Sequence, residues 1–62
     1  MTLTDKADIT YDVIDVEGNV YPAIEWCIKT FGYPSERWFM NNYSFYFRYP
    51  KDAMLFELRW YG

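Results

Sequence analysis

The sequence predicts a small α+β domain in which one helix packs on a small antiparallel sheet. Three observations predict this class: a β-branched run at 9–16, one apolar stripe at helical spacing within 20–31, and period-two alternation in 43–49 and 53–60. The expected order is strand, helix, strand, strand, with one further short strand as an option. At 62 residues the chain is one domain, 1–62, and polar residues 1–8 are expected to form a flexible tail.

The first two elements have local signals at their ends. Residues 9–16 are rich in β-branched side chains, and their apolar pattern changes phase at Val13, which predicts a bulge or a twist at the strand end. Asn19 is a good helix N-cap, Pro22 falls in the first turn, and Gly32 stands where the helix should end. The predicted helical stripe is Val20, Ile24, Cys27, Ile28 and Phe31.

The segment 35–42 admits two interpretations. Ser35 can cap a short helix, or residues 37–40 can form a strand that enters an Asn41-Asn42 turn. We favour the hairpin, because asparagine tolerates the positive φ of a tight turn.

The last twenty residues alternate apolar and polar side chains on both sides of a Pro50-Lys51-Asp52 segment, which is expected to be a turn. This alternation predicts a half-buried antiparallel hairpin of 43–49 with 53–60. The expected core is Ile24, Ile28, Phe31, Phe45, Phe47, Phe56 and Leu58.

The composition limits the cellular compartment and the kinds of partner that we expect. Cys27 is the single cysteine, so no internal disulfide forms, and we expect a cytoplasmic protein without signal peptide or membrane span. The net charge is −3 and uneven: residues 1–25 carry six acids and one base, and residues 26–62 carry three acids and five bases. This acidity argues against duplex DNA as the partner, because phosphate binding needs a concentrated positive field.

Catalysis is not expected. The chain has no histidine, and Asp12 and Asp15 should point to opposite sides of a strand, so neither a neutral-pH base nor a carboxylate pair is available. Cys27 lies within the apolar stripe and is expected to fill the core. No phosphate-binding glycine loop and no metal-ligand spacing occur, so no cofactor and no metal are predicted.

Large aromatic and arginine side chains are the candidate binding residues, since they dominate binding hot spots. Trp26 lies off the helical stripe, either packed against the tail or a loop, or exposed as an anchor. The outer side of the expected C-terminal hairpin would combine Tyr46, Arg48, Arg59 and Tyr61, or it is a solvated face with an Arg48–Glu57 pair. The acidic residues that offer a phosphate-mimicking alternative are Asp5, Asp8, Asp12, Asp15 and Glu17.

The segment 45–60, FYFRYPKDAMLFELRW, resembles the C-terminal part of small accessory proteins of tailed bacteriophages. There an aromatic strand, an Asp-Ala turn and a Phe-x-Leu-x-Trp strand recur. The resemblance implies a protein that binds and redirects a host protein, and it assigns no functional residue.

Together these features predict a non-enzymatic protein that binds a macromolecule, in the narrower form a phage-encoded modulator or inhibitor of a host protein in the host cytoplasm. A small module for RNA or single-stranded nucleic acid is the alternative, since aromatics interleaved with arginines on a sheet can stack bases. Self-association is a third, because a small sheet with edge strands and surplus aromatics can dimerise.

Overall fold

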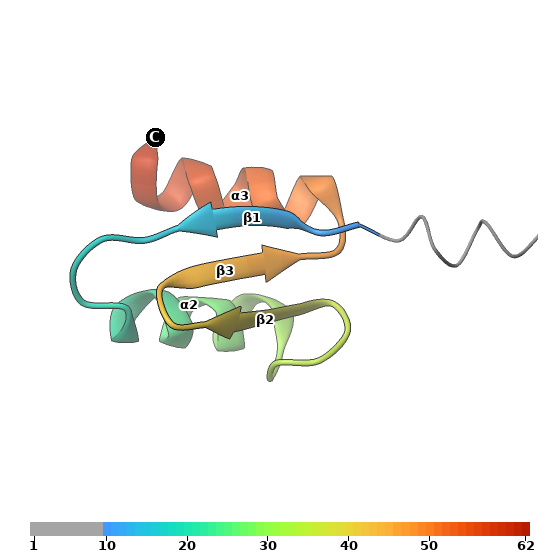
Figure 1. Ribbon diagram of the computed structural model, residues 1–62, viewed down its shortest axis with the longest axis horizontal. Helices are drawn as coiled ribbons and strands as arrows, with labels where there is room; N and C mark the ends of the chain where they lie inside the picture. Colours follow the sequence, from blue (N-terminus) through green and yellow to red (C-terminus); the bar gives the residue numbers. More distant parts are fainter. Residues whose placement is uncertain (1–9) are drawn as a thin grey trace, which may run out of the picture.

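The computed structural model describes residues 10–62, so the expected tail at 1–8 and the start of the first expected strand lie outside the described residues. The elements in order are β1 (Asp12–Asp15), α2 (Tyr21–Phe31), β2 (Trp38–Asn41), β3 (Ser44–Phe47) and α3 (Pro50–Tyr61) (Figure 1). The predicted α+β class is confirmed, with a second helix in place of the last expected strand. Within residues 10–62 no helix is long and apolar enough to cross a membrane.

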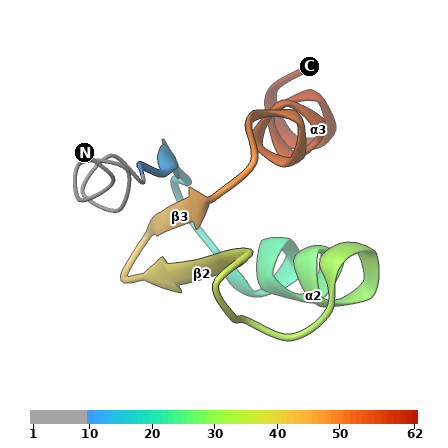
Figure 2. The ribbon, with the colours of Figure 1, turned by 90° about the vertical axis from the view of Figure 1, so that its right-hand side faces the viewer.

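The three strands form one sheet in the order β1-β3-β2, and β3 is antiparallel to both neighbours. β1 and β2 are therefore parallel to each other, and α2 connects them as a β-α-β unit that β3 splits. Both helices lie on the same side of the sheet, with α3 beside β1 and α2 beside β2 (Figure 2). The core forms between this side of the sheet and the helices.

The predicted first helix is confirmed within one residue at its start. The N-cap residue is Val20 and not the predicted Asn19, and no side chain caps the helix from that position. The Asn19 side-chain oxygen, one residue before it, accepts a hydrogen bond from the Tyr21 backbone N–H at 3.1 Å and satisfies one donor of the first turn. The helix ends at Gly32, whose φ of 95° favours glycine and whose N–H donates to the Ile28 carbonyl at 2.9 Å.

The hairpin interpretation of 35–42 is also confirmed. Asn42 adopts φ 60° between β2 and β3, and the strands pair from Trp38 opposite Phe47 to Asn41 opposite Ser44. The Ser35 N–H donates to the Trp38 carbonyl at 2.8 Å instead of starting a helix.

The prediction of a strand at 53–60 is wrong, because residues from Pro50 to Tyr61 form α3. The alternation of apolar residues there also contains the helical spacing of Ala53, Phe56 and Trp60, which face the core. Local signals favour the helix as well: Pro50 occupies the first turn, Asp52 follows in that turn, and 51–60 contain no β-branched residue.

The expected bulge in the first strand is not present, since β1 pairs with β3 in an unbroken register from Asp12 to Asp15. The phase change at Val13 has another cause. Ile14 and Val16 lie on the helix-covered side, whereas Val13 lies on the opposite side and is 51% exposed. Both sides of this strand therefore carry apolar residues.

The core confirms most of the predicted set. Phe45, Phe47 and Phe56 are fully buried, and Ile24, Ile28 and Phe31 pack against them while half-buried. Leu58 was assigned to the core wrongly, since it is 61% exposed on the outward side of α3. Trp38, which was not assigned to the core, is fully buried, and its indole N–H donates to the Gly32 carbonyl at 2.8 Å.

An ion pair joins the first turn of α3 to the loop before β2. The Arg37 Nε lies 2.8 Å from the Asp52 carboxylate, whose side chain is only 3% exposed, and the guanidinium also lies over the Phe31 ring at 4.9 Å. The hydrogen bond with Asp52 raises the pKa of Arg37 further above its usual value. This arginine satisfies a buried carboxylate, so it serves the fold.

Candidate functional site

The four residues expected on one hairpin face are divided between two sides of the domain. Tyr46 and Arg48 belong to β3 and the residue after it, on the side of the sheet away from the helices. Arg59 and Tyr61 belong to α3, which lies against the other side. The predicted placement of these four side chains on one hairpin face is therefore wrong, because residues 50–61 form a helix. Their role in binding stays a prediction.

Each of the four already has an intramolecular partner. Tyr46 stacks on Phe39 at 4.8 Å between ring centroids, and an Arg48 nitrogen lies 3.3 Å from the Glu36 carboxylate. The guanidinium of Arg59 lies 4.6 Å over the Trp60 ring on the same helix. The Tyr61 hydroxyl donates to the Asp15 backbone carbonyl at 2.7 Å, which ties α3 to β1.

Trp26 is half-buried and does not project as a free anchor. Its ring lies 5.5 Å from Phe31 in an edge-on arrangement and 5.9 Å from Phe56, so it packs where α2 meets α3. The sequence placed it off the apolar stripe, and the second helix supplies the contact that was not foreseen.

The side of the sheet away from the helices, here called the outer face, is formed by Tyr11, Val13, Phe39 and Tyr46. No helix or strand among residues 10–62 covers it (Figure 2). Tyr11 packs edge-on against Phe39 at 5.2 Å, and Phe39 stacks on Tyr46 with 16° between the ring planes. Two rings whose centroids are only 4.8 Å apart are too close to lie side by side in one plane. They therefore stack face to face and present their edges to solvent.

A second uncovered surface is the row of large apolar side chains on the outward side of α3. Met54, Leu58 and Tyr61 recur at i, i+4 and i+7 and are 58%, 61% and 58% exposed. The sequence contained this signal once 50–61 is taken as a helix, because the row is then turned away from the side of the helix that carries Ala53, Phe56 and Trp60. We name it the α3 row.

The α3 row adjoins a depression between α3 and β1. From β1 this groove is lined by Asp12, Val13 and Ile14, and from α3 by Pro50, Ala53, Met54 and Glu57. It therefore combines an apolar lining with two carboxylates. Hereafter it is the β1–α3 groove.

Among residues 10–62, no strand pairs with the edge of β1 that borders this groove. The Val16 N–H donates to the Tyr43 carbonyl of the turn before β3. Backbone direction alternates along an antiparallel pair, so Ile14 faces β3 whereas Val13 and Asp15 direct their N–H and C=O to the open edge. The Tyr61 hydroxyl occupies the Asp15 carbonyl, so it marks one end of the open stretch.

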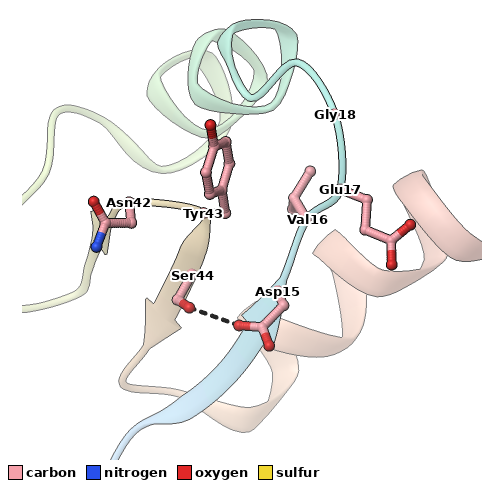
Figure 3. Close-up of a pocket in the computed structure, with 7 residues that line it drawn as sticks. All are labelled: Asp15, Val16, Glu17, Gly18, Asn42, Tyr43 and Ser44. Carbon is pink, nitrogen blue, oxygen red and sulfur yellow. Dashed lines mark hydrogen bonds between the residues drawn. The ribbon is translucent and has the colours of Figure 1, made fainter.

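A shallow depression where β1 ends, beside the turn between β2 and β3, carries two acidic side chains. Figure 3 shows the Asp15 carboxylate beside Ser44, whose Oγ donates to it at 2.6 Å, and the Glu17 carboxylate turned away from the turn residues Asn42 and Tyr43. Within residues 10–62 no three potential metal ligands come together. Of the five acids considered as a phosphate mimic, Asp5 and Asp8 lie outside the described residues.

Cys27 is fully buried on α2, and burial raises the pKa of its thiol to about 12. At neutral pH the thiol therefore stays protonated and is a poor nucleophile. We expect a thiol-alkylating reagent to leave the folded chain unmodified over the time in which the denatured chain reacts completely. Mass spectrometry checks this, and rapid modification of the folded chain would contradict the buried placement.

Comparison with known proteins identifies no relative: no family model, no curated protein and no solved structure matches this chain. Function is therefore inferred from the surfaces of the domain itself.

Proposed function

We propose that this chain is a non-enzymatic domain that binds another protein through the α3 row. The carrying observation is that Met54, Leu58 and Tyr61 are each more than half exposed on one side of one helix. Contiguous exposed apolar side chains on a small domain cost solubility, and such patches mark interaction surfaces. In this proposal Tyr61 is the one binding residue kept from the sequence prediction.

A protein partner fits these surfaces better than a nucleic acid. A base stacks on an aromatic ring that turns its flat side outward, whereas Phe39 and Tyr46 stack on each other and present edges. Arg48 is already paired with Glu36, and the chain has net charge −3, so the field favours no phosphate backbone. Single-stranded nucleic acid stays the second candidate, with the outer face as its site.

A narrower form of this proposal is a phage-encoded modulator of a host protein that works in the host cytoplasm. The support for the phage origin is the resemblance of the C-terminal segment. The support for the compartment is the single buried, free Cys27.

The α3 row is tested by replacing Met54 and Leu58 together with serine. Both side chains are exposed, so we expect the melting temperature to stay within a few degrees. Binding of the partner captured from the lysate of the native cell should be lost, and nuclease treatment should leave capture by the unchanged chain intact.

The matched control is Tyr33→Ser, which removes a still more exposed apolar side chain, at 78%, from the loop before β2. This variant should capture the partner as the unchanged chain does. Equal capture by the Met54/Leu58 variant and the unchanged chain would refute the assignment of the row, and capture that depends on nucleic acid would favour the alternative.

A further inference from the structure

We infer that the β1–α3 groove receives an extended, basic segment of the partner protein, which pairs with β1 as a fourth strand. This inference rests on the proposed function and assigns the partner's chemistry. It joins three features of the groove: an open strand edge, an apolar wall and unpaired carboxylates.

The first feature is the backbone of β1. Val13 directs both its N–H and its C=O to the open edge, and a paired segment would satisfy both groups. The other edge of the sheet is less available, since the Trp38 carbonyl of β2 accepts the Ser35 N–H at 2.8 Å. An added strand therefore finds its best position at β1.

The second feature is the position of α3. This helix lies beside β1 at the margin of the sheet, as the end-on view shows (Figure 2). Met54 lines the groove with its side chain 58% exposed, and Tyr61 closes one end. The side chains of an added strand that point toward the helices would cover this apolar wall, since alternate residues of a strand share one face.

The third feature is charge. Asp12 and Glu57 both line the groove and both are exposed. The ion pairs among residues 10–62 join Arg37 to Asp52 and Arg48 to Glu36, so neither groove carboxylate has a cationic partner there. A lysine or arginine among the helix-facing residues of the added strand would complement them.

The same charges exclude a second copy of this chain as the preferred occupant. Pairing of two β1 strands would bring a second Asp12, Asp15 and Glu57 to the same edge. Like charges gathered at one interface disfavour the pairing.

The probe is a capped peptide of about seven residues, with threonine at every second position and valine or lysine at the positions between. It is compared with the same peptide carrying glutamate in place of lysine. Amide hydrogen exchange, read by NMR on the isotopically labelled chain, reports the pairing. We expect the lysine peptide to slow exchange of the Val13 and Asp15 N–H groups, and the glutamate peptide to leave them unchanged.

Two variants separate charge from backbone pairing. Asp12→Lys combined with Glu57→Lys should weaken binding of the lysine peptide about tenfold and allow the glutamate peptide to bind. Val13→Pro removes an N–H that faces away from β3, so the sheet should persist while strand addition is lost. Far-ultraviolet circular dichroism checks that each variant is folded.

Several outcomes overturn the inference and are distinct from failure of the proposed function. Peptide binding without slower exchange at Val13 would remove the strand pairing. Absence of binding by the lysine peptide at millimolar concentration would remove the basic occupant, and a dimer in sedimentation with Val13 protected would assign the groove to a second copy. In each case the loss of the lysate partner on Met54/Leu58 replacement still decides the proposed function separately.

Discussion

Replacing Phe56 with alanine is expected to destabilise the domain by about 3–5 kcal/mol, because it leaves a cavity where both helices pack against the sheet. The Phe56 ring lies 5.0 Å from Phe45, 5.1 Å from Phe47 and 5.9 Å from Trp26, and it is fully buried. A domain of 62 residues has a free energy of unfolding on the order of 3–9 kcal/mol, so this substitution should remove a large part of it. Urea titration followed by circular dichroism measures the change.

Leu58→Ala is the matched control, two residues further along the same helix. Its side chain is 61% exposed, so the free energy of unfolding should change by no more than about 0.5 kcal/mol. In a strand the two side chains would share one face and both changes would be costly. Equal losses at Phe56 and Leu58 would therefore contradict the helix at 50–61.

Replacing Trp38 with alanine is expected to cost about 3–5 kcal/mol as well. Its indole is fully buried, stacks on Phe45 at 6.2 Å and donates to the Gly32 carbonyl, which holds the end of α2 against β2. Trp38→Phe keeps most of the ring and loses the hydrogen bond, so we expect about 1–2 kcal/mol from it. The melting temperatures of the two variants show which one loses more stability.

Tyr33→Ala in the nearby loop is the control, since that ring is 78% exposed and should contribute little. If Trp38→Ala and Tyr33→Ala had the same melting temperature, the indole would not be part of the core. If Trp38→Phe were as damaging as Trp38→Ala, the hydrogen bond to Gly32 would outweigh the packing.

The candidate site was predictable only in part. Residue types pointed to tyrosine, tryptophan and arginine, and Tyr61 does border the β1–α3 groove. The sequence did not indicate Met54 or Leu58, because the strand interpretation turned both toward the core. A single misassigned element therefore placed Met54 and Leu58 on the wrong side, whereas Phe56 and Trp60 face the core in either conformation.

The sequence by itself determined those elements whose ends carry local chemistry. Gly32 ends the first helix, Asn19 accepts a hydrogen bond from its first turn, and the positive φ that Asn42 tolerates closes the hairpin between β2 and β3. These signals act through hydrogen bonds and backbone sterics within a few residues, so they do not depend on the rest of the fold.

The tertiary structure decided the order β1-β3-β2, and it decided the conformation of 50–61 together with the local signals at Pro50 and Asp52. The spacing of Met54, Phe56, Leu58 and Trp60 suits a strand, and that of Ala53, Phe56 and Trp60 suits a helix, so periodicity alone cannot choose. The choice depends on which surface exists to bury these side chains. Once β3 lies between β1 and β2, Phe45 and Phe47 offer an apolar surface that α3 covers with Phe56 and Trp60, while β1 keeps an open edge.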